Sequence, residues 1–341
     1  MTFVARMTEF GERAPLPDML TRGAIAALVA RTDRRLGDGS AAVDLRFAKA
    51  MADFPIAINT REANEQHYEL PPSFFGYILG ARRKYSSCFY ADASASLDEA
   101  EEEALSRTIA NAALRDGQRV LELGCGWGSL AMAMAERFPG SEIVAVSNAH
   151  AQRAHIKGRA AALGLRNLTV LTADMNGFAP SGTFDRIVSV EMFEHMSNWR
   201  ALLERARGWL KPDGRLFIHI FTYRGKPYRF ETGDRADWIA RHFFTGGIMP
   251  SHGLAHRFPD LFAVEEEWRW SGEHYRRTAD DWLRNFDRNR DMIDPILAEV
   301  YGGDANLWRR RWRLFFLATS SLFGHRGGDR WGVGHYRLRP A

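Results

Sequence analysis

Short apolar runs alternate with amphipathic stretches along the middle of the chain, beginning at residue 119. The apolar runs with the length of a strand are RVLELG, EIVAVS, NLTVLTAD, FDRIVSV and GRLFIHIF. The stretches between them that carry apolar residues at helical spacing are SLAMAMAERF, AQRAHIKGRAAALG and WRALLERARGWL. Strands and helices in this alternation predict a parallel sheet with helices on both faces. Such a sheet binds ligands at the carboxyl ends of its strands.

Helical spacing also appears before this region. Residues 17–53 predict amphipathic helices, and residues 97–114 predict a helix with acids in its first turns, where they favour the helix dipole. Residues 64–90 are rich in aromatic residues and are interrupted by Pro71 and Pro72. We expect this part of the chain to form an irregular covering segment and no strand of the sheet.

The alternation stops after residue 221. About thirty residues (TYRGKPYRFETGDRADWIARHFFTGGIMPS) follow before the next strand signals, FAVEEEWRW and WGVGHYRLR. An insertion of this length in that place usually forms a lid or a wall over a ligand site. We therefore predict an inserted lid at about residues 222–260.

Composition narrows the class of protein. The chain has 341 residues and a net charge of +4, with basic residues scattered among Asp and Glu. The nearest candidate for a nucleic-acid face is LWRRRWRLFF (residues 307–316), whose apolar half looks like core, so we expect no nucleic-acid partner.

The location of the protein is predicted from three further features. Cys88 and Cys125 provide no disulfide framework and fit a reducing compartment. The N-terminal stretch MTFVARMTEFGERAP lacks the apolar core of a signal peptide, and no apolar run approaches the ~20 residues of a membrane span. We expect a soluble, cytoplasmic protein.

A glycine-rich turn, VLELGCGWGSL (residues 120–130), joins the first predicted strand to a helix. Gly124, Gly126 and Gly128 let the backbone approach a ligand closely, although dinucleotide dehydrogenases use a related turn. A dehydrogenase would follow its second strand with Asp or Glu for the ribose, whereas EIVAVS ends in Ser147 and is followed by Asn148. This difference weakens the interpretation as a nicotinamide site.

Two carboxylates and an imidazole follow the strand FDRIVSV, in the segment VEMFEHMSN. If this segment forms a helical turn, Glu191, Glu194 and His195 lie at i, i+3 and i+4 and could meet one ligand. The alternative is that Glu191 and Glu194 cap a helix or pair with nearby Arg, and that His195 is a buried histidine with its hydrogen bonds satisfied. Their place at the carboxyl end of a strand favours a functional site.

These motifs carry a family resemblance. The string LELGCGWGSL resembles the first motif of S-adenosylmethionine (SAM)-dependent methyltransferases, and KYSSCFY, SVEMFEHM and HFFTGGIMPS resemble the cyclopropane fatty acid synthase superfamily. Within it, NEQHYELPPSFF, GEHYRRTADDWL and DPILAEVYG are most similar to the coclaurine N-methyltransferase group. The similarity runs from about residue 60 to the end.

The resemblance implies a fold and a domain organisation. The fold is α/β, a class I SAM-methyltransferase, Rossmann-like, doubly wound sheet of seven strands with an inserted lid after the fifth strand. Residues 1–96 are expected to form a helical N-terminal cover over cofactor and substrate. Residues 97–341 are expected to form the methyltransferase domain, with the lid at about 222–260 inside it.

The resemblance also implies the cofactor contacts, with SAM as donor and S-adenosylhomocysteine (SAH) as product. They fall on Tyr85, Ser86, Gly124, Gly126, Ser147, Gln152, Asp174 and Met175. Gln152 can bridge the ribose hydroxyls that an acid would otherwise hold. Asp174 ends a strand at the ligand edge, with helix capping as its alternative role. For Tyr85 and Ser86 the alternative is loop packing.

Methyl transfer from a sulfonium depends mostly on alignment of the nucleophile. An amine must, however, arrive without its proton, and its product regains positive charge, so carboxylates serve both needs. In the N-methyltransferase group the matching residues implicated in catalysis and amine binding fall on Glu191, Glu194, His195 and Tyr68. Trp312 and Phe315 on a late helix are expected to line the substrate pocket, with core packing as the equal alternative.

The cyclopropane synthases use the same frame differently, with a bound bicarbonate as proton acceptor. Its holders in that family correspond to Glu194, His219 and Tyr275, while Ser87 and Phe221 stand where the synthases have Cys and Ile. Glu191 replaces a glycine typical of the synthases. These departures move the site away from ring closure, but Ser87 could still donate a hydrogen bond to an anion.

We therefore predict a SAM-dependent methyltransferase that N-methylates a small hydrophobic or aromatic amine, with no metal in the site. The first alternative is carbon methylation or cyclopropanation of unsaturated acyl lipids, which would bring bicarbonate and peripheral lipid contact. The second alternative is a non-catalytic cofactor-binding scaffold. A homodimer is compatible with each of these functions.

Overall fold

Seven strands form one mixed sheet at the centre of the molecule. The computed structural model describes residue 12 and residues 16–58, 70–230 and 238–341. In spatial order the strands are β3 (Leu168–Thr172), β2 (Glu142–Ser147), β1 (Arg119–Leu123), β4 (Phe184–Val190), β5 (Leu210–Tyr223), β9 (Trp331–Pro340) and β8 (Phe262–Ser271). The first five are parallel, and β9 and β8 extend the sheet in antiparallel pairing. The predicted doubly wound α/β sheet of seven strands is confirmed.

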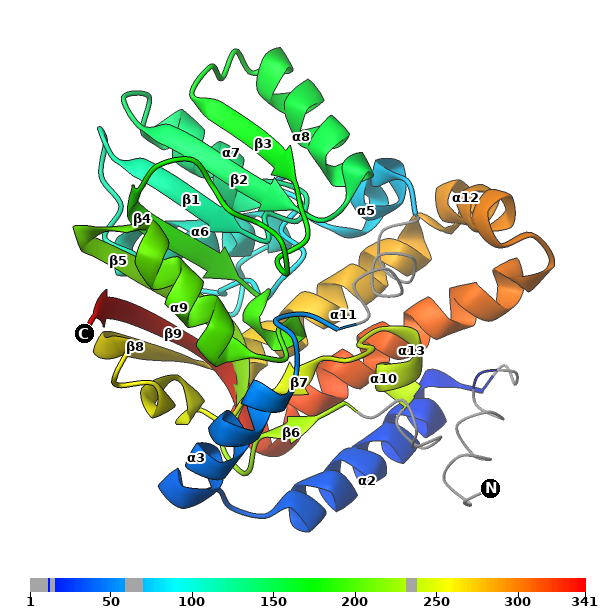
Figure 1. The fold of residues 1–341 in the computed structure, drawn as a ribbon. Coiled ribbons are helices and arrows are strands. Elements are labelled where there is room, and N and C mark those ends of the chain that lie inside the picture. The colour runs from blue at the N-terminus through cyan, green and yellow to red at the C-terminus, as the bar shows by residue number, and fades with distance from the viewer. Residues whose placement is uncertain (1–11, 13–15, 59–69, 231–237) are drawn as a thin grey trace.

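Helices cover both faces of this sheet (Figure 1). One face packs on α6 (Leu97–Asn111), α7 (Ser129–Arg137) and α8 (His150–Ala162). The other packs on α3 (Ala41–Ala50) and α9 (Trp199–Trp209), together with the short helices η1 (Met51–Asp53) and η3 (Leu254–Arg257). Apolar residues of β1 and β2 alternate between the two faces, because successive side chains in a strand point in opposite directions.

A second layer of helices packs beyond the carboxyl ends of the strands. It comprises α2 (Asp18–Leu36), α5 (Pro72–Ile78), α11 (Gly272–Arg288), α12 (Arg290–Tyr301) and α13 (Ala305–Phe323), and α11 and α13 run side by side in Figure 1. An aromatic cluster fills the space between these helices and the end of β5. Five short 3-10 helices lie in the described ranges, of which η4 (Gly302–Asp304) and η5 (His325–Gly328) flank α13.

Two expectations about this layer have clear outcomes. Pro71 and Pro72 do not interrupt structure but begin α5, where a proline costs no hydrogen bond because the first helical N–H groups have no partner within the helix. The arginine-rich stretch of α13 forms ion pairs within the protein: Arg311 pairs with Glu12, and Arg313 pairs with Asp18 and Asp287. Of its aromatic residues, Trp312 and Phe316 are core, and Trp308 and Phe315 are partly buried and pack against that core.

The insertion after β5 has secondary structure of its own. A small sheet pairs β6 (Tyr228–Arg229) with β7 (Ile248–Met249), and α10 (Trp238–His242) lies between these strands in the sequence. The division at residue 96 and the role of residues 222–260 as a lid stay predictions. No helix in the described ranges is long and apolar enough to cross a membrane.

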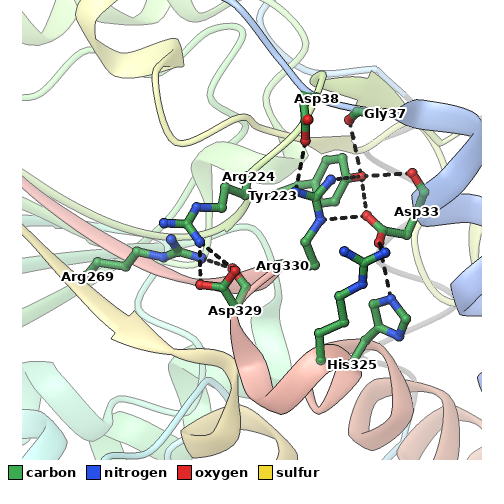
Figure 2. A network of polar contacts seen from close by, with 10 residues as sticks. Asp33, Gly37, Asp38, Tyr223, Arg224, Arg269, His325, Asp329 and Arg330 are labelled. Atoms are coloured by element: carbon green, nitrogen blue, oxygen red, sulfur yellow. Dashed lines mark hydrogen bonds and ion pairs between the residues drawn. The ribbon is translucent and has the colours of Figure 1, made fainter.

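A buried aspartate ties α2 to the C-terminal part of the sheet (Figure 2). The carboxylate of Asp33 accepts hydrogen bonds from Arg330 Nε at 2.6 Å and from the Tyr223 hydroxyl at 2.8 Å, and His325 Nε2 lies 3.2 Å from it. Burial alone would raise the pKa of Asp33, but the hydrogen bonds from Tyr223, Arg330 and His325 outweigh it and hold that pKa below its usual value. Tyr223 is the last residue of β5, so this cluster fixes α2 over the end of the strand.

We expect Asp33→Asn to lower the free energy of unfolding by about 3 kcal/mol, because it removes the buried charge partner of Arg330, whose second partner, Asp38, is exposed. Folding lowers the pKa of Asp33, so its contribution is complete above the ordinary pKa of aspartate and is lost as the pH falls through the lower folded value. The difference between the two proteins should therefore shrink in acid, as measured by urea unfolding at several pH values. Asp329→Asn is the matched control, since its side chain is 56% exposed and its pairing with Arg224 should contribute less than about 1 kcal/mol. Equal losses for the two variants would contradict this account.

Candidate active site

A cavity opens at the carboxyl ends of β1, β2 and β4, where the sequence placed the ligand. All the residues that the resemblance assigns to the cofactor line it, namely Tyr85, Ser86, Gly124, Gly126, Ser147, Gln152, Asp174 and Met175. Glu191 and His195 line the same cavity. The described structure thus brings the glycine turn and the acidic segment to one place, although β1 and β4 are separated by sixty residues (123 to 184) in the chain.

The three glycines of the turn serve different purposes. All have positive φ, and a Cβ on Gly124 would lie 2.6 Å from Met192 Cβ, while a Cβ on Gly128 would lie 2.6 Å from Ile156 Cγ1. These two glycines are required for close packing. Gly126 has φ +49°, but a Cβ there would meet no protein atom within 4 Å. Because Gly126 lines the cavity, the space in front of it is open to a ligand.

Polar groups on the cavity wall fit a ligand with hydroxyl and amino groups. Ser147 Oγ donates to Gln152 Oε1 at 2.5 Å, which leaves the buried Gln152 Nε2 without a partner among the described residues. One carboxylate oxygen of Glu122 is similarly buried and unpartnered within the described ranges, and burial raises the pKa of Glu122 to about 8. Buried polar atoms normally have partners, so a ligand that supplies them is expected here. The hydroxyl groups of the SAM ribose could accept a hydrogen bond from Gln152 Nε2.

Asp174 shapes the cavity from the end of β3. Its carboxylate accepts a hydrogen bond from the backbone N–H of Asn176 at 2.7 Å, and Asn176 in turn bonds the backbone of Ala57 through both atoms of its amide. The residue therefore holds a turn, and does not cap a helix, while it lines the cavity beside Met175.

The acidic segment folds differently from the expected single turn. Only Phe193–His195 form a turn, a short 3-10 helix η2, and Glu191 precedes it with φ +48°. The reason lies in the sheet: the backbone N–H of Glu191 donates to the carbonyl of His219 at 2.8 Å and continues the β4–β5 ladder by one residue. The left-handed conformation then turns the chain. Glu191 and Glu194 consequently lie in different surroundings.

The carboxylate of Glu191 sits in a cradle of hydrogen-bond donors. It accepts from the backbone N–H of Ser87 at 2.9 Å and from the Tyr275 hydroxyl at 2.8 Å, and His219 Nε2 lies 3.3 Å from it. These donors come from the loop before α6, from α11 and from β5. Ser87 and the two ring-bearing residues are those that the resemblance linked to a bound anion. Here they surround a carboxylate of the protein itself, and the Ser87 hydroxyl donates to the Cys88 carbonyl.

Glu194 is fully buried and does not line the cavity. One of its oxygens accepts from the backbone N–H of Phe221 at 2.7 Å, and the other has no partner among the described residues. Burial, with the charge of Glu191 nearby, raises the pKa of Glu194 well above its usual value. Burial also raises the pKa of Glu191, but the Lys84 charge and the hydrogen bonds from Ser87 and Tyr275 oppose this effect. Of the two acids, Glu194 therefore has the more strongly raised pKa.

Lys84 is a charged residue of the site that the sequence analysis missed. It is fully buried, lines the cavity, and donates through Nζ to Ser86 Oγ and to the Ser87 carbonyl, both at 2.5 Å. Burial lowers the pKa of Lys84, while the charges of neighbouring acids, including Glu191, oppose this change. The sequence feature that could have indicated this residue is the lysine at the start of the aromatic string KYSSCFY.

His195 faces the same cavity from the other side of the segment. Its ring stacks on Phe244 of the insertion, with centroids 4.4 Å apart and an interplanar angle of 22°. Burial lowers the pKa of His195 to about 4, although the charge of Glu191 opposes this shift. The imidazole is therefore neutral at physiological pH and can accept a hydrogen bond.

The aromatic residues proposed for the substrate pocket lie in the helical layer. Trp312 is fully buried against Phe74 and Phe243, with ring centroids 5.0 and 5.1 Å apart, and Phe315 stacks on Phe243 at 4.5 Å. Neither residue lines the cavity described above, in agreement with the alternative of core packing. Tyr68 lies outside the described residues.

Fold and site together define a class I SAM-dependent methyltransferase. The family described as mycolic acid cyclopropane synthetase matches residues 57–328, and the chain belongs to this family. The (S)-coclaurine N-methyltransferase of Thalictrum flavum subsp. glaucum is 33% identical, over 85% of this chain and 82% of the relative. The cyclopropane-fatty-acyl-phospholipid synthase of Escherichia coli (strain K12) is 30% identical, over 79% of this chain and 66% of the relative.

Solved structures agree with this membership. The crystal structure of coclaurine N-methyltransferase bound to N-methylheliamine and SAH covers 99% of this chain and all of its own, with a TM-score of 0.94 and 29% identity. The cyclopropane synthase MmaA2 from Mycobacterium tuberculosis shares the fold, with a TM-score of 0.68 and 21% identity over 84% of this chain and 99% of its own. The predicted family, enzyme class and SAM cofactor are confirmed.

We expect Gly126→Ala to weaken SAM binding about tenfold or more, because the added methyl group enters the space reserved for the cofactor. Gly164→Ala is the matched control. Gly164 also has a positive φ, at +69°, and open space around it, but it lies outside the cavity lining.

Both substitutions place alanine in the left-handed region and should each lower the free energy of unfolding by about 1–2 kcal/mol. Calorimetric titration with SAM and SAH then separates backbone strain from loss of the site. Similar SAM affinities for the two variants would show that Gly126 does not contact the cofactor.

Proposed function

We propose that this enzyme transfers the methyl group of SAM to the nitrogen of a small hydrophobic or aromatic amine of the alkaloid type. The observation that carries the proposal is the carboxylate of Glu191, held by the hydrogen-bond donors Ser87 and Tyr275 at the wall of the cavity. The names of the relatives support the class of substrate, since they include (S)-coclaurine, pavine and (S)-tetrahydroprotoberberine N-methyltransferases.

The chemistry divides between cofactor and protein. SAM, when bound, supplies a methyl group already activated on a sulfonium, which leaves as a neutral thioether. The residues of this chain have to bind a cationic amine, remove its proton and aim its lone pair. Gln152 and the glycine turn are suited to hold the cofactor, and the acidic segment to serve the amine.

Glu191 can both bind and deprotonate the substrate. Its carboxylate attracts the ammonium form of the amine, and burial raises its pKa, which brings its basicity closer to that of an amine. His195 is neutral and can accept a second N–H of the substrate, which orients the nitrogen toward the methyl group. Glu194 accepts a hydrogen bond from the backbone N–H of Phe221 and so holds the end of β5. Tyr68, Trp312 and Phe315 stay candidates for substrate contact.

The lipid alternative is less well supported by the geometry. In the cyclopropane synthases, as the resemblance implies, a bicarbonate takes the proton. In this chain the carboxylate of Glu191 already occupies the donors of Ser87, Tyr275 and His219. A free anion would have to compete with a tethered one for the same hydrogen bonds, so neither bicarbonate nor a lipid partner is part of the proposal.

A direct test incubates the purified enzyme with methyl-labelled SAM and two panels, one of aromatic and cyclic amines and one of phospholipid vesicles with unsaturated chains. Mass spectrometry of the products locates the transferred carbon. Label on nitrogen of an amine is the expected result. Label in acyl chains, with none in any amine, would overturn the proposal.

We expect Glu191→Gln to lower kcat by about 100-fold or more, the usual contribution of a positioned base, while SAM affinity stays within about twofold. The wild-type rate should rise with pH along an acid limb, because only the ionised carboxylate accepts a proton. Burial places that limb above the ordinary range of a glutamate, and Glu191→Gln should abolish it. Unchanged turnover of amines would remove Glu191 from the catalytic set.

A second variant tests the cradle itself. Glu191→Gly removes the carboxylate, relieves the positive φ and leaves the donors of Ser87, Tyr275 and His219 in place. We expect added formate or bicarbonate to restore part of its activity in a saturable manner. Glu191→Gln is the control, since its amide still fills the cradle and should prevent rescue. Failure of both anions to act on the glycine variant would argue against an anion site at this position.

A further inference from the structure

A line of hydrogen bonds leads away from Glu191 through the sheet. His219 Nδ1 lies 2.8 Å from His335 Nε2, and His335 Nδ1 lies 2.9 Å from Asn111 Nδ2. The two histidines are direct neighbours on β5 and β9, and Asn111 is the last residue of α6. Both imidazoles are fully buried, and His335 packs against Trp270 with ring centroids 4.2 Å apart. Neither His335 nor Asn111 lines the cavity.

The hydrogens along this line can be counted. Burial, followed by the charge of Lys84, holds the pKa of His219 well below its usual value, and burial with the neighbouring His219 does the same for the pKa of His335. Each ring is therefore neutral and carries one N–H. An ionised carboxylate only accepts, so the N–H of His219 must be on Nε2. His219 Nδ1 then accepts from His335 Nε2, and His335 Nδ1 accepts from the Asn111 amide.

The same direction follows from the other end of the line. The amide of Asn111 presents its nitrogen, a donor, to His335 Nδ1. Three hydrogen bonds thus receive three hydrogens, one each from Asn111, His335 and His219, and all point toward Glu191.

We propose that Asn111 and His335 are positioning residues, which fix the tautomer of His219 so that its N–H faces Glu191 and favours the ionised carboxylate. The other titratable or charged groups that face this carboxylate are Lys84, Tyr275 and, from its own segment, Glu194 and His195. Asn111 and His335 add to these a neutral, directional contribution from outside the cavity. The value of this arrangement for catalysis rests on the proposed function of Glu191.

The tautomers can be measured without any substrate. In 15N NMR of the histidine-labelled protein, His219 and His335 should both show an unprotonated Nδ1 and a protonated Nε2 from neutral to mildly acidic pH. Loss of signals in His219→Gln and His335→Gln assigns them among the 11 histidines of the chain. A proton on Nδ1 of either ring, or a charged ring, would overturn the inference.

Asn111→Asp tests whether three hydrogens are shared among these three hydrogen bonds. An ionised aspartate cannot donate, so three hydrogen bonds are left with two hydrogens, and the line must take up one more proton. We expect an altered tautomer or a charged ring in the 15N spectrum. We also expect the acid limb of the amine methylation rate to move to higher pH by about one pH unit or more.

Two controls separate this effect from simpler ones. Ala110→Asp adds the same charge at the exposed neighbouring position and should leave both tautomers unchanged. Asn111→Leu removes the donor to His335 Nδ1 without adding a charge or an acceptor. The preference for the Nε2–H tautomers should therefore weaken, but no ring should become charged, and the acid limb should move less than in Asn111→Asp. Unchanged tautomers in Asn111→Asp, or equal effects of Asn111→Asp and Ala110→Asp, would refute the positioning role. If the tautomers behave as expected but the enzyme methylates no amine, the proposed function fails and this inference stands.

Discussion

The burial of one carboxylate, Glu191, determines how this site is built. A buried charge is unfavourable unless several donors and an opposite charge surround it. Glu191 meets this requirement with donors from three separate elements and with Lys84, whose charge lowers the pKa of Glu191. Holding it also requires a left-handed backbone, which costs about 1–2 kcal/mol for a residue with a side chain. The sheet register, the loop before α6 and α11 all have to be correct for this charge to be tolerated.

The same constraint separates the roles of the two neighbouring acids. The charge of one buried carboxylate raises the pKa of its neighbour, and the carboxylate with fewer donors has the more strongly raised pKa. Glu194 accepts from one backbone N–H and has a pKa well above its usual value, whereas the donors and the charge of Lys84 around Glu191 lower the pKa of Glu191 against the effect of burial. The insertion contributes Phe244 to the opposite wall, where it holds the neutral ring of His195 flat. The charged groups of the site thus lie on the sheet and its adjoining loops, and the insertion contributes an aromatic wall.

Much of this fold was predictable, because buried strands bounded by turns have strong local signals. The runs EIVAVS and FDRIVSV coincide with β2 and β4 residue for residue, and the cofactor side of the cavity followed from the glycine turn and the strand ends. The cradle was not predictable from spacing, since Ser87, His219 and Tyr275 are far apart in the chain and meet only through tertiary packing. Local patterns also gave no sign that Glu191 would leave the helical turn, because a backbone hydrogen bond to β5 decides its conformation.

The left-handed conformation at position 191 links the two branches of this family in an unexpected way. Glycine, which the synthases are expected to have there, accepts such a conformation without strain. Glycine codons GGA and GGG become the glutamate codons GAA and GAG through a single base substitution. A site that binds a free anion and a site in which a glutamate supplies the carboxylate are therefore one base substitution apart. A change of chemistry can begin with no movement of the backbone.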